Sequence, residues 1–191
     1  MRSIGRRHLW AALSLAELAA LTAALAGCMP LASSAASSPA SSSPPVVVSQ
    51  PPVSSVVARA AAALEAAYRQ AGFGLIPARR PYRPSEPPAL IPVPRSVYQV
   101  VLPKDPGSGY VVIYQAADPA AAQSLATAMQ RYLESGFGET NFPTDARFAV
   151  QAYDATVVFG WYSPGASADP ATAAAALRVL RSFGEPFPVV R

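Results

Sequence analysis

Three aromatic side chains fall on predicted strands, where they are candidates to bind a partner. Tyr110 and Tyr114 belong to the apolar segment Tyr110–Ala116, and Trp161 belongs to Thr156–Tyr162. Aromatic residues are enriched at binding interfaces because they combine a large apolar area with a polar group. On an open sheet face these side chains would suit a peptide, a glycan or an apolar ligand. Packing in the core is the alternative, since strand aromatics commonly do that.

Basic residues concentrate in a second candidate segment. Residues 73–95 contain seven prolines, and Arg79, Arg80 and Arg83 lie there with Tyr82 among them. A guanidinium group pairs well with carboxylate or phosphate, so this loop suits an anionic polymer or headgroup. A solvated charged loop is the alternative. Together with the three strand aromatics, these four residues form the candidate interaction surface.

The acidic residues do not suggest a catalytic pair. Asp118 and Asp169 each precede a proline and an alanine-rich run, as expected for a helix N-cap followed by proline at the first helical position. A glycosidase-like site needs two carboxyl groups that converge in one cleft. A carboxylate-dependent hydrolase is therefore only a remote alternative.

The elements that position these residues follow from periodicity and turn signals. A helix is expected over Val56–Ala71, ending at Gly72, because apolar residues recur there at helical spacing. Two strand–strand–helix units follow, with helices after Asp118 and Asp169 and strands over 97–102, 110–116, 148–153 and 156–162. We therefore predict an α+β fold with a four-stranded, mainly antiparallel sheet and an extra N-terminal helix.

Similar tripeptides recur in the two units at a shared offset of 46 residues. Val111-Val112-Ile113 matches Val157-Val158-Phe159, and Phe137-Gly138-Glu139 matches Phe183-Gly184-Glu185. Internal duplication is one reading of this offset, and chance likeness of two ordinary units is the other. We expect both unit helices on one face of the sheet, which would leave the second face open or covered only by the first helix and the proline-rich segment.

The N-terminus has the layout of an export signal. Arg2, Arg6 and Arg7 precede an apolar run, and Leu25-Ala26-Gly27-Cys28 closes it with the chain's only cysteine. This arrangement resembles the signal peptide and lipobox of bacterial lipoproteins. The resemblance implies cleavage before Cys28, a lipid anchor on its sulfur and a further acyl chain such as palmitate. An uncleaved membrane helix is the alternative, but Glu17 near its centre opposes it.

Cleavage would divide the chain into a signal peptide (1–27), a lipidated, uncharged Ser/Pro/Ala tether (28–55) and one folded domain (56–191). The signal would carry away His8, the only histidine, and the lipid would occupy Cys28. The mature domain would then have no means for Ser-His-Asp or Cys-His catalysis and no Cys/His metal or haem site. We expect no cofactor and no bound metal.

Charge gives no reason to expect nucleic acid as a partner. Without residues 1–27 the chain keeps twelve basic and ten acidic side chains, which is too even a balance for that. The resemblance places the protein on the cell membrane or outer membrane, facing the periplasm or the exterior. We predict a non-catalytic envelope lipoprotein that presents its α+β domain to an envelope protein or glycan. A module that binds a small amphiphile or glycan between the sheet and the first helix is the alternative.

Overall fold

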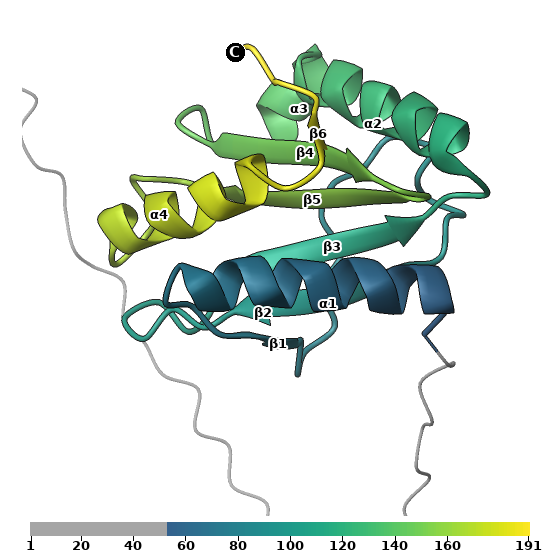
Figure 1. Cartoon of the computed structure of the whole chain (residues 1–191). Coiled ribbons are helices and arrows are strands. Elements are labelled where there is room, and N and C mark those ends of the chain that lie inside the picture. Colours follow the sequence, from purple (N-terminus) through teal and green to yellow (C-terminus); the bar gives the residue numbers. More distant parts are fainter. Residues whose placement is uncertain (1–52) are drawn as a thin grey trace, which may run out of the picture. The chain divides into compact units, whose positions relative to one another are not determined.

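The computed structural model describes residues 53–191 as an antiparallel sheet with helices on both faces (Figure 1). The strands pair in the order β1-β2-β3-β5-β4-β6. They are β1 (Leu75–Pro77), β2 (Arg95–Val100), β3 (Tyr110–Gln115), β4 (Arg147–Tyr153), β5 (Thr156–Tyr162) and β6 (Glu185–Pro186). The helices are α1 (Ser55–Gln70), α2 (Pro119–Leu133), α3 (Gly136–Asn141) and α4 (Pro170–Arg181). Cys28, the predicted signal peptide and tether residues 28–52 lie outside the described residues.

The α+β class is confirmed, but the predicted four-stranded sheet is wrong because β1 and β6 extend it to six strands. The first pairs with the outer edge of β2 and the second with the outer edge of β4. Each is only two or three residues long and ends in a proline, Pro77 or Pro186. Proline has no backbone N–H to donate to a neighbouring strand. It is therefore tolerated on an edge strand, where one side has no neighbour. Such short segments carry none of the alternation that identified the four longer strands.

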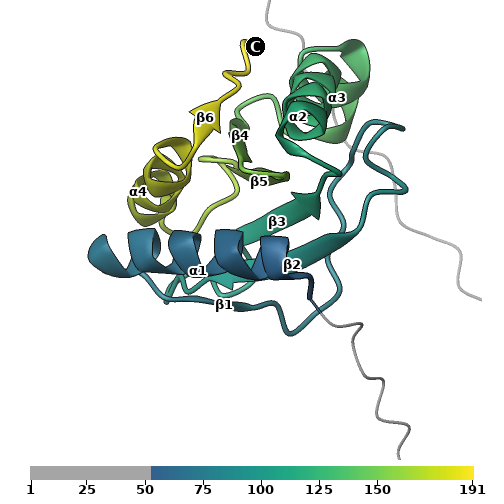
Figure 2. The ribbon, with the colours of Figure 1, turned by 45° about the vertical axis from the view of Figure 1, so that its right-hand side comes forward.

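The two unit helices lie on opposite faces of the sheet, which corrects the expectation that they share one. One core packs α1 and α4 against the sheet, and the other packs α2 against it, with α3 beside α2 (Figure 2). Val111 belongs to the first core, whereas Val157, 46 residues later, belongs to the second. The segment between β1 and β2 also packs on the α2 face through Tyr82, Leu90 and Val93. Neither face is open within the described residues.

The second pair of matching tripeptides adopts two different structures. Phe137-Gly138-Glu139 lies inside α3, a short helix that the two-unit pattern did not predict. Phe183-Gly184-Glu185 instead forms the bend into β6, with Gly184 at a φ of +76°. Corresponding residues therefore differ in both face and conformation, which favours chance likeness over duplication.

Helix starts follow the predicted capping residues. The side chain of Ser54 accepts a hydrogen bond from the Val57 amide at the start of α1. Asp118 does the same for the Ala121 amide at 2.8 Å, and Asp169 for the Thr172 amide at 3.2 Å. The capping interpretation of both acidic residues is confirmed, and their places on opposite faces of the sheet remove them as a catalytic pair.

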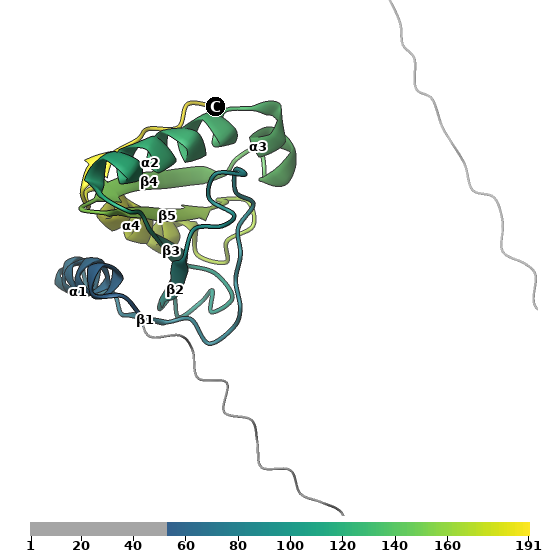
Figure 3. The ribbon, with the colours of Figure 1, turned by 90° about the vertical axis from the view of Figure 1, so that its right-hand side faces the viewer.

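The C-terminal segment after β6 ties the edge of the sheet to α2 (Figure 3). The Phe187 amide donates to the Val150 carbonyl of β4 at 2.9 Å. Farther along, Gln130 of α2 donates to the Pro188 carbonyl at 2.7 Å, and Glu134 accepts from the Val190 amide at 3.0 Å. We call β6 and the segment that follows it, residues 185–190, the C-terminal strap.

Candidate functional site

Three of the predicted interaction residues meet at one end of the sheet. Tyr110 begins β3 and Trp161 lies near the end of β5, and these antiparallel neighbours bring the two side chains together. Tyr82 covers them from the segment between β1 and β2. Its ring stacks on that of Tyr110 with centroids 4.2 Å apart, and its hydroxyl accepts a 2.8 Å hydrogen bond from the Trp161 indole N–H. We call these three residues the aromatic cluster.

The hydroxyl of Tyr82 is neutral, as a tyrosine hydroxyl ordinarily is at physiological pH, and its surroundings reinforce that state. Burial raises its pKa, and the nearby Tyr110 adds to that rise, whereas the hydrogen bond from Trp161 works in the opposite direction. The phenol therefore stays protonated at physiological pH. The cluster offers aromatic rings and neutral polar groups, and it contributes no charge of its own.

An open pocket of about 250 Å³ adjoins the aromatic cluster. The loop before β3 and the loop after β5 supply its other walls. Besides the cluster it is lined by Asp105, Gly107, Ser108, Gly109, Tyr162, Ser163, Ala166, Ser167 and Ala173. We call it the aromatic pocket. Its volume lies just below the range typical of small-molecule sites, and its mixture of aromatic and sparse polar lining is typical of them.

Internal hydrogen bonds order the polar wall of the pocket. The Ser163 hydroxyl donates to Asp145 at 2.6 Å, and the Gly165 amide donates to the other oxygen of the same carboxylate at 2.6 Å. These two bonds hold the pKa of Asp145 below its usual value. On the opposite loop, Asp105 accepts a 3.0 Å hydrogen bond from Ser167. The wall is therefore preorganised rather than mobile in its side-chain rotamers.

Tyr114, the fourth aromatic candidate, is fully buried in the α2-side core and presents no surface. Its hydroxyl donates to the carboxylate of Glu86 at 2.7 Å. Burial and this carboxylate raise the pKa of Tyr114, so the phenol keeps the proton that it donates. The core alternative is the one that the structure supports for this residue.

The arginines of the loop, Arg79, Arg80 and Arg83, are all exposed, and Arg83 is in addition held by an ion pair. Arg83 pairs with Glu86, its Nε donating to Oε1 at 2.7 Å, and Arg95 approaches the same oxygen at 3.5 Å. Since the Glu86 side chain is only 2% exposed, this carboxylate fastens the loop onto the sheet. The Arg83 side chain is therefore engaged internally.

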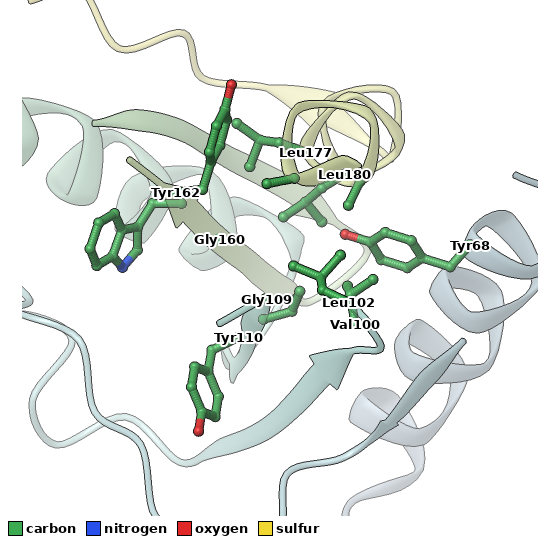
Figure 4. Close-up of a pocket in the computed structure, with 13 residues that line it drawn as sticks. Tyr68, Val100, Leu102, Gly109, Tyr110, Gly160, Tyr162, Leu177 and Leu180 are labelled. Atoms are coloured by element: carbon green, nitrogen blue, oxygen red, sulfur yellow. The ribbon is translucent and has the colours of Figure 1, made fainter. Parts of the chain in front are cut away.

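The space between α1 and the sheet, proposed above for an amphiphile, is filled. Tyr68 of α1 points at Val100 and Leu102, while Leu177 and Leu180 of α4 close the space from the other side (Figure 4). The gap that remains measures about 30 Å³, the share of one water molecule. Burial raises the pKa of Tyr68, which keeps its phenol neutral there. A small amphiphile or glycan therefore has no room at this interface.

The described part of the chain has neither a metal-binding cluster nor a membrane-spanning helix. Over residues 53–191, no three His, Cys, Asp or Glu side chains gather closely enough to hold a metal ion. Within the same range, every helix is too short or too polar to span a bilayer.

Several residues of the site escaped the sequence analysis. Glu86 is the lone acid of an arginine-rich, proline-rich segment, and its i, i+3 spacing from Arg83 was a usable signal. Asp105 and Asp145 were readable only as turn residues, because the serines that they bind lie far along the chain. No protein-family model, curated protein or solved structure matches this chain.

Proposed function

We propose that the chain is a lipoprotein of the bacterial cell envelope, anchored at Cys28 to the cell membrane or outer membrane. Its domain faces the periplasm or the exterior and acts as a non-catalytic binding module for another envelope component. The lipobox Leu25-Ala26-Gly27-Cys28 supports the anchor. One observation carries the binding role, namely that a stacked, hydrogen-bonded aromatic cluster lines an open pocket instead of the core.

The pocket is lined by residue types that contribute strongly to binding. Binding energy at interfaces concentrates in a few tryptophan, tyrosine and arginine side chains. Trp161 and Tyr110 are half-buried beside the pocket, and the exposed Arg79 and Arg80 lie on the same segment as Tyr82. The partner would seat a side group in the pocket and an acidic surface over the two arginines.

The anchor is tested by mass spectrometry and fractionation of the natural product. The expected result is a chain that begins at Cys28, carries its lipid and sediments with membranes, whereas Cys28→Ser leaves the domain in the soluble fraction. An intact leader, or a free thiol on soluble protein, would contradict the anchor.

The binding role is tested by affinity capture from detergent-solubilised envelope. We compare the natural chain with Trp161→Ala and with the control Phe137→Ala, whose side chain is 75% exposed on α3, outside the pocket lining. The expected result is a partner retained by the natural chain and the control but lost with Trp161→Ala. The same protein set captured by all three chains, or none above background, counts against the proposal.

A module for a small amphiphile or glycan is the second candidate. Its support is the aromatic pocket, which at about 250 Å³ has the room that the α1–sheet interface lacks. Saturable binding of a purified small ligand by the isolated chain, without any protein partner, would favour this candidate over the first.

A further inference from the structure

We propose that the aromatic pocket recognises an organic ammonium group, held between the aromatic rings and the carboxylate of Asp105. This inference rests on the proposed binding function and names the chemical class of its ligand. Three observations support it: the charge of the lining, the state of its hydrogen-bond donors, and the rings themselves.

The charge of the lining is negative. Within residues 53–191, Asp105 is the only charged side chain that lines the pocket. The neighbouring Lys104 is paired with Asp169, its Nζ lying 3.6 Å from the carboxylate. An anionic ligand would therefore meet an uncompensated carboxylate, whereas a cation would find its counter-ion.

Three side-chain donors of the pocket are already in use. The Trp161 indole N–H bonds Tyr82, the Ser163 hydroxyl bonds Asp145, and the Ser167 hydroxyl bonds Asp105. Apart from the phenols and the Ser108 hydroxyl, the side chains of the lining therefore offer acceptors. An alkylated ammonium has protons or polarised methyl groups to give and needs no donor in return. A sugar presents hydroxyls that both donate and accept, and it is less well matched.

The aromatic rings are the second binding element for an ammonium group, beside the carboxylate of Asp105. A cation is attracted to the face of an aromatic ring, most strongly to that of tryptophan, and aromatic enclosures are a recurrent means of binding quaternary ammonium groups. Tyr82, Tyr110, Trp161 and Tyr162 all line this pocket. Its volume of about 250 Å³ lies below the usual range for drug-sized ligands, which suits a headgroup rather than a long chain.

The protein carries its own reporter for the test. Trp10 and Trp161 are the only tryptophans, and cleavage before Cys28 removes Trp10, so Trp161 is the sole indole emitter of the mature chain; Trp10→Phe ensures the same for any chain that keeps the leader. In uncharged detergent we titrate this chain with choline and with 3,3-dimethylbutan-1-ol, its uncharged isostere. Saturable change in Trp161 emission is expected at millimolar choline, with binding of the alcohol about tenfold weaker, as a lost cation–π contact predicts.

Two charge variants locate the counter-ion. Asp105→Asn is expected to weaken choline about threefold to tenfold, whereas Asp154→Asn, which removes a carboxylate from the exposed β4–β5 turn, leaves affinity unchanged. Circular dichroism confirms that both variants are folded. Phosphocholine and Nα-acetyl-lysine methylamide then distinguish a lipid headgroup from a lysine side chain as the source of the ammonium.

Two outcomes overturn the inference. Equal affinity for choline and its uncharged isostere would make the pocket merely apolar. Binding of a neutral oligosaccharide with no response to choline would make it a glycan site. Neither result decides whether Trp161→Ala loses the partner in the envelope capture. The capture experiment therefore still tests the binding role by itself, and a wrong ligand class can be distinguished from a wrong binding role.

Discussion

The carboxylate of Glu86 should be the most sensitive polar group of the domain. Its side chain is 2% exposed and accepts from Tyr114 at 2.7 Å and from Arg83 at 2.7 Å, with Arg95 at 3.5 Å. Breaking a buried ion pair costs about 3–5 kcal/mol when the remaining charge is fully buried. Here the two arginines are 48% and 23% exposed, so water compensates part of the loss. We expect Glu86→Gln to lower the free energy of unfolding by about 2–3 kcal/mol.

Urea unfolding of residues 53–191 measures this cost directly. With a slope of about 2 kcal/mol/M, the midpoint should fall by roughly 1–1.5 M without a change of slope. The control is Glu65→Gln, which breaks an exposed pair with Arg69 and should cost less than about 0.5 kcal/mol. If Glu86→Gln shifts the midpoint no more than this control does, the carboxylate does not hold the loop and the reasoning fails.

Three further predictions test other parts of the fold by the same urea assay. Gly184→Ala should lower the free energy of unfolding by about 3 kcal/mol, because its φ is +76° and a Cβ would collide with the Ala152 carbonyl. Gly72→Ala, at a φ of +82° with open space around it, should lower it by only about 1 kcal/mol. Equal losses for the two variants would contradict the collision. Hydrogen bonds lower the pKa of Asp145 below 3.8, so its stabilisation is present above that pH and is lost as the pH falls through the folded-state pKa. The urea midpoint of Asp145→Asn should therefore fall less steeply below about pH 5 than that of the natural chain. The same decline in both chains would contradict this prediction. Asp118→Ala should cost about 1 kcal/mol through loss of the α2 cap, and a cost near zero would show that the cap is dispensable.

The positions of the longer elements were predictable because their signals are local. An aspartate followed by proline marks the starts of α2 and α4, and Gly72 marks the end of α1. These signals depend on backbone chemistry within a few residues, and tertiary contacts did not override them. The edge strands β1 and β6 lack any such signal, since they owe their conformation to the strand beside them.

The face that each helix covers was harder to predict, although one signal was present. Val111–Tyr114 and Val157–Gly160 are buried without interruption. Continuous apolar runs of this kind indicate strands covered on both faces, and that pattern already argued against an open face. The 46-residue offset suggested instead that matching residues of the two units share a face of the sheet. In the structure Val111 pairs with Gly160 of β5, so Val157, three residues from Gly160, lies on the opposite face from Val111.

The aromatic residues of the candidate site were predictable, but their assembly was not. Tyr82, Tyr110 and Trp161 were all singled out by type, yet the hydrogen bond between the first and the last joins residues 79 positions apart. No local pattern encodes such a contact. The same local view could not separate Tyr114 from Tyr110. The two lie four residues apart on one face of β3, yet Tyr114 is buried in the core and Tyr110 lines the pocket.

The C-terminal strap gives the native domain a route to self-association that does not require global unfolding. Only Gln151 and Ala152 of β4 are paired with β6, and few hydrogen bonds hold the strap farther along. Phe187 and Val189 pack against the α2-side core, but a terminal segment held by so few hydrogen bonds opens more often than the whole domain unfolds. Hydrogen exchange at the Phe187 and Val190 amides would report that opening. Each opening bares an edge strand, which is a template for pairing with another chain. Association of this protein should then follow the exchange rate of those two amides rather than its midpoint in urea.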